Sequence, residues 1–269
     1  MILGLIRAAC VELSRSQKLL TDRRTDGRTD GRTDGHANLI GGLVPRNPPK
    51  KPYIDTIKQM LGVRQTTCSD TIFLELGIGN GKSMVKNKQT NFLNKLQNRT
   101  SQTYVNDTIN KAILHKSPMG KQIQNLMNHQ ENHSEIFLEA LRRKVRNSNT
   151  TKRLEYTTLN PELVPNNIYL SEQIRSEYNR IAYTRMRLSS HRLKIETGRW
   201  ARIPKEQRLC QCGEDVQTEQ HVLLKCQQTK NFRDDIPNIM NCRNICELFT
   251  NINPNEIAIL CKNVLNHFE

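Results

Sequence analysis

Three cysteines and one histidine near residue 220 have a spacing that suits a tetrahedral metal site. Cys210, Cys212, His221 and Cys226 follow the pattern C-x-C-x8-H-x4-C, which places four ligands within 17 residues. Thiolate sulfur and imidazole nitrogen are the ligands that Zn²⁺ takes in structural sites. Gly213 follows the second cysteine and permits the tight turn that a metal-binding knuckle needs. The spacing predicts a structural Zn²⁺ site, and the alternative is free or buried thiols beside a surface histidine.

The last two of these residues, His221 and Cys226, are five apart on a helix that we expect to begin at Thr218. Because one face of an α-helix repeats every three or four residues, this helix should bend or fray before Cys226. Six of the eight cysteines lie in the last 60 residues, and no convincing secretion signal precedes them. We therefore expect an intracellular protein, nuclear or cytoplasmic, with reduced thiols. The remaining cysteines of the tail should be small core residues, namely Cys242, Cys246 and Cys261.

The densest basic stretch of the chain, residues 171–208, directly precedes the metal motif. It carries ten Lys or Arg against four Glu, a local net charge of +6, with Tyr178, Tyr183 and Trp200 between them. Basic groups neutralise phosphates, and aromatic rings stack on unpaired bases. The candidate nucleic-acid-binding residues are Arg175, Arg180, Arg185, Arg187, Arg192, Lys194, Arg199 and Arg202. The alternative is a solvated helix face with its rings in the core, and the single tryptophan favours a core position for Trp200.

Two further motifs resemble catalytic signatures, but each lacks a required part. Residues 77–83, Gly-Ile-Gly-Asn-Gly-Lys-Ser, approach a phosphate-binding loop, yet the full pattern needs glycine where Leu76 stands. Residues 232–235, Phe-Arg-Asp-Asp, match the paired carboxylates of reverse transcriptases without apolar flanking strands, and Lys230 and Arg233 offer simple charge partners. We therefore expect a turn and a surface charge cluster, no enzyme activity and no small-molecule substrate.

The overall composition narrows the classes of partner. The 269 residues include 41 Lys and Arg against 26 Asp and Glu, for a net charge of +15, and 36% of them are hydrophobic. The positive charge favours a polyanionic partner. The low apolar content argues against one large, well-packed core over the whole length. No apolar run reaches the ~18 residues of a transmembrane helix, so an integral membrane protein is excluded, and we expect no membrane partner.

The periodicity of apolar residues predicts a mostly α fold, an irregular helical bundle with a small zinc-knuckle-like loop. Ser117, Ser134, Ser171 and Asn253 are the expected N-caps of helices. We divide the chain into a short helix over 1–20, a disordered repeat and Pro/Gly linker over 21–52, a helical connector over 53–149 and a basic helical tail over 150–269. The linker contains a repeated Thr-Asp-Gly-Arg unit without an apolar residue.

The tail resembles the segment that follows the polymerase in non-LTR (LINE-type) retrotransposon reverse transcriptases. The similar segments read RMRL and TGRW within 185–200, RLCQCG over 208–213, and EQHVLL with a following cysteine over 219–226. A weaker similarity includes LELG over 74–77 and KQTNFL over 88–93, so the resemblance spans roughly residues 70–269. It implies that the CCHC segment binds zinc through Cys210, Cys212, His221 and Cys226. It also implies a role in holding RNA or DNA.

The chain departs from that family because the polymerase palm with its carboxylates, and any endonuclease domain, are missing from the sequence. We therefore expect a non-catalytic fragment, a zinc-stapled tail that binds RNA or DNA. The alternative is an inert or protein-interaction helical module without a metal or nucleic-acid role. The oligomeric state and the preference between RNA and DNA stay open.

Overall fold

The computed structural model describes residues 50–97, 103–128, 132–169, 171 and 173–269. Helices and loops make up these ranges, and their β pairing is confined to one isolated antiparallel bridge between Leu209 and Val216. The predicted mostly α fold is confirmed. No helix in the described part of the chain is long and apolar enough to cross a membrane. The predictions for residues 1–49, a helix followed by a disordered linker, fall outside the described residues.

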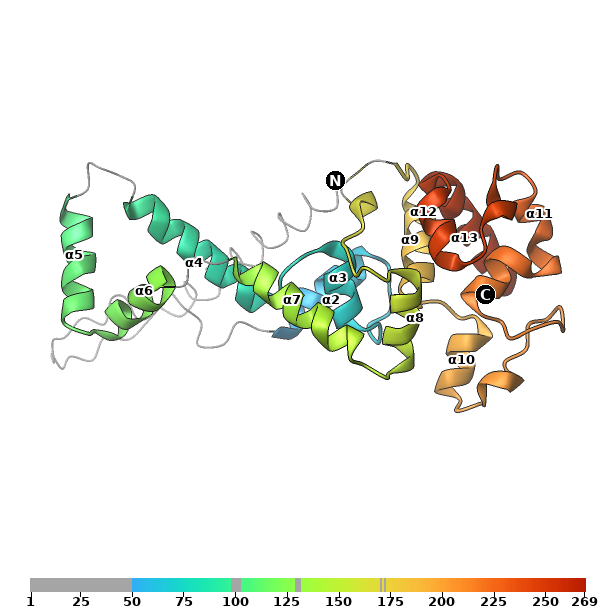
Figure 1. Cartoon of the computed structure of the whole chain (residues 1–269), viewed down its shortest axis with the longest axis horizontal. Coiled ribbons are helices and arrows are strands. Elements are labelled where there is room, and N and C mark those ends of the chain that lie inside the picture. Colours follow the sequence, from blue (N-terminus) through green and yellow to red (C-terminus); the bar gives the residue numbers. More distant parts are fainter. Residues whose placement is uncertain (1–49, 98–102, 129–131, 170, 172) are drawn as a thin grey trace, which may run out of the picture.

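Three helices form an arm at the left end of the molecule in Figure 1, namely α4 (Gly81–Gln97), α5 (Thr103–Leu114) and α6 (Pro118–Asn128). Leu93, Ile109 and Ile123 are the buried residues of its small apolar cluster. Ser117 caps α6 as predicted, because its Oγ accepts a hydrogen bond from the backbone N–H of Gly120 at 2.9 Å. The arm therefore has its own minor core, with few buried side chains.

The remaining helices form the body, which Figure 1 shows from its centre to its right end. These are α2 (Lys50–Met60), α3 (Ser69–Leu76), α7 (His133–Arg146), α8 (Thr151–Leu159), α9 (Glu177–Arg187), α10 (Lys194–Trp200), α11 (Lys230–Arg233), α12 (Ile245–Asn251) and α13 (Pro254–Phe268). One apolar core runs from Ile57 to Leu265. The predicted boundary at residue 150 does not break this core, since α7 and α8 contact each other across it.

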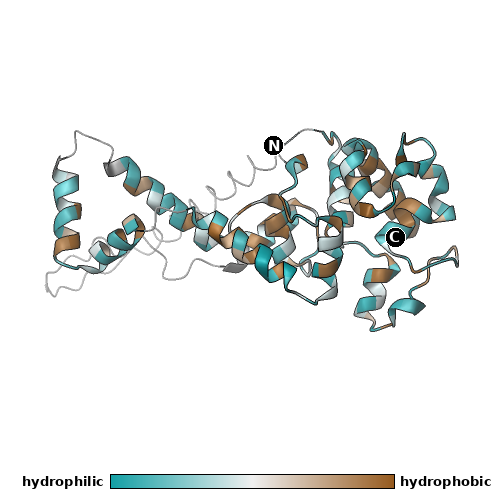
Figure 2. Ribbon diagram, viewed as in Figure 1, coloured by the Kyte–Doolittle hydropathy of each residue, from teal (hydrophilic) through white to brown (hydrophobic). Residues whose placement is uncertain are grey.

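Helix α13 illustrates how the sequence forms these elements. The side chain of Asn253 accepts a hydrogen bond from the backbone N–H of Asn255 at 2.9 Å, and Pro254 occupies the first turn. The buried residues then recur every three or four positions: Ile257, Leu260, Cys261, Val264 and Leu265. Figure 2 shows brown, hydrophobic segments alternating with teal ones along the body helices. This apolar face packs along α9, which carries part of the predicted basic stretch.

Two predicted caps are wrong. Helix α7 begins at His133, and its cap is Asn132, whose side chain accepts from the backbone N–H of Ser134 at 3.1 Å. Helix α9 begins at Glu177 instead of directly after Ser171. Ile174 is buried in the loop before α9, so this apolar residue anchors a loop to the core and does not belong to the helical stripe.

The segment that resembles a phosphate-binding loop is a turn between α3 and α4, as expected. Gly77 ends α3 in the left-handed conformation with φ of 62°, and a Cβ there would lie 2.6 Å from Pro165. The backbone N–H of Ser83 donates to Oδ1 of Asn80 at 2.9 Å. This N–H of the first turn of α4 is therefore satisfied by the chain itself.

A buried ion pair joins helix α3 to helix α9 in the core of the body. Glu75 on α3 is fully buried, and Nη2 of Arg187 on α9 donates to its Oε2 at 3.0 Å. The hydroxyl of Tyr156 donates to the same carboxylate at 2.9 Å, and the amide of Asn166 donates at 3.2 Å. Burial raises the pKa of Glu75, but Arg187 and these hydrogen bonds outweigh burial and hold the pKa below its ordinary value.

Candidate metal centre and its basic surroundings

The four predicted metal ligands lie together. Their donor atoms are all within 4.8 Å of one another. Sγ of Cys210 is 3.7 Å from Sγ of Cys226, and Sγ of Cys212 is 3.2 Å from Nε2 of His221. Around a tetrahedral Zn²⁺ with ordinary bond lengths, two sulfurs lie about 3.8 Å apart, and a sulfur and a nitrogen about 3.5 Å. The geometry therefore fits a metal ion.

A disulfide does not account for this cluster. The cysteines of the described residues are free thiols, and the 3.7 Å between Cys210 and Cys226 far exceeds a sulfur–sulfur bond of about 2.05 Å. Cys210, His221 and Cys226 are buried, while Cys212 is half-buried. The donor set thus forms a mostly enclosed group that can hold a metal ion.

The loop with the first two cysteines is a tight knuckle closed by the bridge between Leu209 and Val216. The backbone N–H of Cys210 donates to the carbonyl of Asp215 at 2.8 Å, and that of Gly213 donates to the carbonyl of Cys210 at 3.0 Å. Gly213 has φ of 80°, and a Cβ there would meet nothing within 4 Å. Its conformation, and not a lack of space, is the reason for glycine at this position.

The other two ligands lie at the ends of a π-helical turn, η3 (His221–Lys225): His221 is its first residue, and Cys226 directly follows its last. The backbone N–H of Cys226 donates to the carbonyl of His221 at 2.8 Å, which is the i to i+5 bond of a π-helix. Thr218 precedes the turn, and its Oγ1 accepts from the backbone N–H of His221 at 3.1 Å. The expected bend is therefore a widened turn. It places Cys226, five residues after His221, beside that histidine.

Three of the four candidate ligands have shifted pKa values. Burial raises the pKa of Cys212, but hydrogen bonds from the backbone N–H of Glu214 and from Cys210 and Cys226 hold it below its ordinary value. Burial, with the neighbouring cysteine thiols, raises the pKa of Cys226 to about 11. Burial also lowers the pKa of His221, which favours the neutral imidazole that a metal requires. A bound cation would supply the positive charge that lets several thiols ionise together.

Arg233 lies beside the candidate metal centre, and the sequence interpretation missed its contact with a ligand segment. Its guanidinium is buried, and it donates to the carbonyl of Cys226 at 2.8 Å and to the hydroxyl of Thr229 at 2.7 Å. It therefore supports the segment that carries the last ligand, where a charge pair with Asp234 or Asp235 was expected. The available signal was its position four residues after Thr229 and seven after Cys226.

Two further contacts position the ligands. The side chain of Gln217 accepts from the backbone N–H of Lys194 at 2.7 Å, and its amide lies 3.8 Å from Sγ of Cys210 as a donor. Nε2 of His191 lies 2.8 Å from the carboxylate of Glu219, two residues before His221. The knuckle is thus hydrogen-bonded to the start of α10 and to the loop before it.

The predicted basic residues divide into two groups. Arg175, Arg192, Lys194 and Arg202 are exposed. Arg180, Arg185, Arg187 and Arg199 are half-buried or buried. The structure corrects the prediction for Arg187. This residue forms the ion pair with Glu75 in the core and is buried. Its predicted place in a nucleic-acid-binding surface is wrong, because a buried guanidinium paired with a carboxylate has no access to a polyanion.

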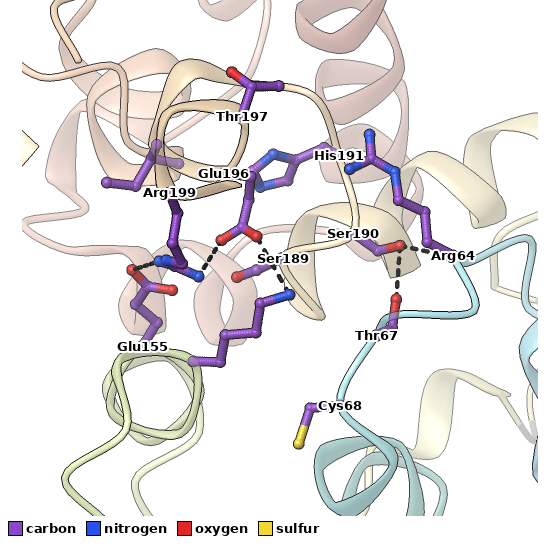
Figure 3. Close-up of polar contacts among 12 residues, drawn as sticks. Arg64, Thr67, Cys68, Glu155, Ser189, Ser190, His191, Glu196, Thr197 and Arg199 are labelled. Atoms are coloured by element: carbon purple, nitrogen blue, oxygen red, sulfur yellow. Dashed lines mark hydrogen bonds and ion pairs between the residues drawn. The ribbon is translucent and has the colours of Figure 1, made fainter. Parts of the chain in front are cut away.

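Figure 3 shows that Arg199 is also engaged by carboxylates. Its guanidinium lies 2.6 Å from the carboxylate of Glu155 and 2.5 Å from that of Glu196. Glu196 is fully buried, and Lys152 contacts its second oxygen at 3.3 Å. This chain of charges joins α8 to α10 and leaves Arg199 less available to an external anion than the four exposed basic residues.

The aromatic residues of the basic stretch have mixed positions. Tyr183 is buried, whereas Tyr178 is 78% exposed. Trp200 is 49% exposed, so the expected core position is wrong. The guanidinium of Arg64 lies 4.3 Å from the centre of its ring. This cation–π contact holds the tryptophan at the surface.

The other cysteines of the tail are less uniform than predicted. Cys261 is fully buried on α13, as expected for a core residue, and its pKa is raised by burial. Cys242 and Cys246 are only half-buried. The interpretation as core residues therefore holds for Cys261 and only in part for the other two.

Comparison of the chain with family models, with curated proteins and with solved structures gives no match.

Proposed function

We propose that the body of this protein is a zinc-stabilised module that binds RNA or DNA, of the kind that follows the polymerase in non-LTR retrotransposon reverse transcriptases. The donor set of three thiols and one imidazole supports Zn²⁺ in preference to harder ions, which take oxygen ligands. The proposed role is binding without catalysis. A nuclear or cytoplasmic location belongs to the proposal, because thiols stay reduced there.

The observation that carries the proposal is the connection between the knuckle and α10. The side-chain oxygen of Gln217 accepts from the backbone N–H of Lys194, and its carbonyl accepts from that of Ile195 at 3.3 Å. Arg208, two residues before the first ligand, donates to the carbonyl of Ile195 at 2.9 Å. A metal in the knuckle would therefore order the helix that presents Lys194 and ends beside Arg202.

Exposed positive charge supports the choice of a polyanion as partner. Arg175, Arg192, Lys194 and Arg202 lie at the surface, and Tyr178 and Trp200 expose aromatic rings within the same stretch. Guanidinium and ammonium groups bind phosphates, and exposed rings stack on unpaired bases. A metal-ordered segment with both kinds of group suits a single-stranded nucleic acid.

The experiment is an equilibrium titration of a labelled oligonucleotide with the purified, metal-analysed protein. If the four exposed basic residues contact phosphates, the logarithm of the affinity should fall by about 3 per tenfold increase in salt. This corresponds to roughly a 50-fold loss between about 50 and 200 mM salt. The protein should contain about one zinc per chain, the ratio set by one four-ligand site. Chelated protein should bind much more weakly.

A matched control is the variant Cys246→Ser, which removes a half-buried thiol outside the knuckle. Its metal content and affinity should equal those of the unchanged protein, whereas Cys210→Ser should lose both. The proposal fails if the protein binds no oligonucleotide at about 50 mM salt. It also fails if the metal-free protein binds as tightly as the metal-loaded one.

A further inference from the structure

A polar hollow lies on the body where the loop after α2 meets the loop after α9. It has a volume of about 350 Å³. Its lining residues are Gly62, Val63, Arg64, Arg185, Ser190, Arg192 and Glu269. Three arginines from two distant parts of the chain therefore face one small space.

The positive charge in this hollow is not balanced by the side chains that line it. Glu269 is the only carboxylate side chain among its lining residues, against three guanidinium groups. Nη1 of Arg64 is buried without a hydrogen-bond partner. Burial lowers the pKa of Arg64, the carboxylates of Glu269 and Glu196 oppose this change, and Arg192 and Arg185 lower the pKa further. Three guanidinium groups against one carboxylate around a single hollow form an environment whose excess positive charge an anionic ligand would balance.

Backbone contacts fix the position of Arg64 in this hollow. Its backbone N–H donates to Oγ of Ser190 at 2.9 Å, and the hydroxyl of Thr67 donates to the same oxygen at 3.0 Å (Figure 3). Arg185 is oriented by its Nε, which donates to the carbonyl of Gly62 at 2.8 Å. Two of the arginines, Arg64 through its backbone and Arg185 through its side chain, are thus held before any ligand arrives, so less conformational entropy is lost on binding.

The exposed ring of Trp200 contacts Arg64, which lines the hollow. The guanidinium of Arg64 lies 4.3 Å from its ring centre, and about half of the side chain is exposed. One arginine therefore contacts both the hollow and an exposed ring. Adjacent phosphate and base positions are the two features that a single-stranded nucleic acid presents together.

We infer that Arg64, Arg185 and Arg192 form a binding site for one backbone phosphate of a single-stranded nucleic acid, with the neighbouring base stacked on Trp200. The inference rests on the proposed function and names the position where the strand is held most tightly. Glu269 contributes a competing charge, because its carboxylate lines the hollow and accepts a hydrogen bond from the backbone N–H of Arg192. An incoming phosphate would repel or displace it.

Trp200 is the only tryptophan, so its fluorescence reports directly on this site. The full chain is titrated with a single-stranded RNA of roughly 12 nucleotides, and separately with inorganic phosphate and with oligoglutamate. The RNA should change the emission, and Arg64→Gln should weaken RNA binding by roughly 10-fold or more. The matched control Arg175→Gln removes an exposed arginine that does not line the hollow and should weaken binding by about 3-fold at most. Glu269→Gln should strengthen binding by roughly 2- to 5-fold.

The outcomes separate this site from the proposed function. If RNA binds but Arg64→Gln and Arg175→Gln weaken it equally, the phosphate site is overturned and the proposed function stands. If RNA does not bind but inorganic phosphate changes the emission in an Arg64-dependent way, the anion site stands and the proposed function fails. If neither binds, both are overturned. Oligoglutamate binding as tight as RNA binding would overturn the phosphate assignment, because the hollow would then recognise charge alone.

Discussion

Two buried polar centres of the body differ in how their charge is balanced. The Glu75 centre is closed, because Arg187 supplies the opposite charge from within the chain and three further side chains donate to the carboxylate. The cysteine centre is open, because its thiols lie within 4.8 Å of one another and of a neutral imidazole. The first can be complete in the protein alone, whereas the second can take a cation from solution. The stability of the cysteine centre should therefore depend on metal, and that of the Glu75 centre on Arg187 and on pH.

Metal removal should produce the largest effect, and it should be confined to the open centre. Structural Zn²⁺ in small domains contributes apparent binding free energies of about 10–16 kcal/mol. Chelation, or the variant Cys226→Ser, should unfold the region around the knuckle and α10. Hydrogen exchange with and without chelator measures this loss of protection. Cys246→Ser, which lies outside the knuckle, should retain the protection, and an unchanged exchange pattern after chelation would contradict the comparison.

Loss of the internal cation should produce the next largest effect, and it should not depend on metal. Arg187→Met leaves Glu75 buried without its partner, which should cost about 3–5 kcal/mol of the free energy of unfolding. Denaturant unfolding measures this change. Arg175→Met should cost less than about 0.5 kcal/mol, because Arg175 is exposed. Adding Glu75→Gln to Arg187→Met should restore part of the loss, and a double variant worse than the single one would argue against a charge-balanced centre.

Acid should reveal the closed centre through the smallest of the three effects. Because the pKa of Glu75 in the folded protein lies below its ordinary value of 4.5, the unfolded chain binds more protons near that pH. Its contribution to stability is fully present above pH 4.5 and is lost as the pH falls through the folded-state pKa. The free energy of unfolding against pH measures it. Glu75→Gln should flatten this acid slope, whereas Glu162→Gln, at an exposed position, should leave it unchanged.

The two centres also differ in what could be predicted from the sequence. The metal ligands lie within 17 residues, so their spacing alone indicated the cluster. Arg187 looked like its basic neighbours, because its partner Glu75 lies 112 residues earlier and no local pattern marks the pair. Arg64 escaped for the same reason, since its contact with Ser190 spans 126 residues. The spacing of nearby residues therefore predicted the metal ligands. Contacts between residues far apart in the sequence determine which arginines stay accessible to a ligand.

Helix ends follow the same division between local and distant causes. The caps at Ser117 and Asn253 were predicted correctly, because a cap needs only its own next few residues. The start at Ser134 was wrong by a small shift, since Asn132 offers a competing side-chain acceptor. The start of α9 was wrong by more, because the burial of Ile174 in a loop depends on the rest of the core.

The separation of Glu75 and Arg187 also sets an order of events during synthesis. The ribosome adds about 5–20 residues per second, so the 112 residues between the two require roughly 6 to 22 s. Throughout that interval the nascent chain carries α3 with an acid side chain whose cation has not yet been made. Burying that carboxylate alone would be costly, so α3 should stay hydrated until α9 has emerged. The closed centre should therefore delay assembly of the body until most of the chain exists.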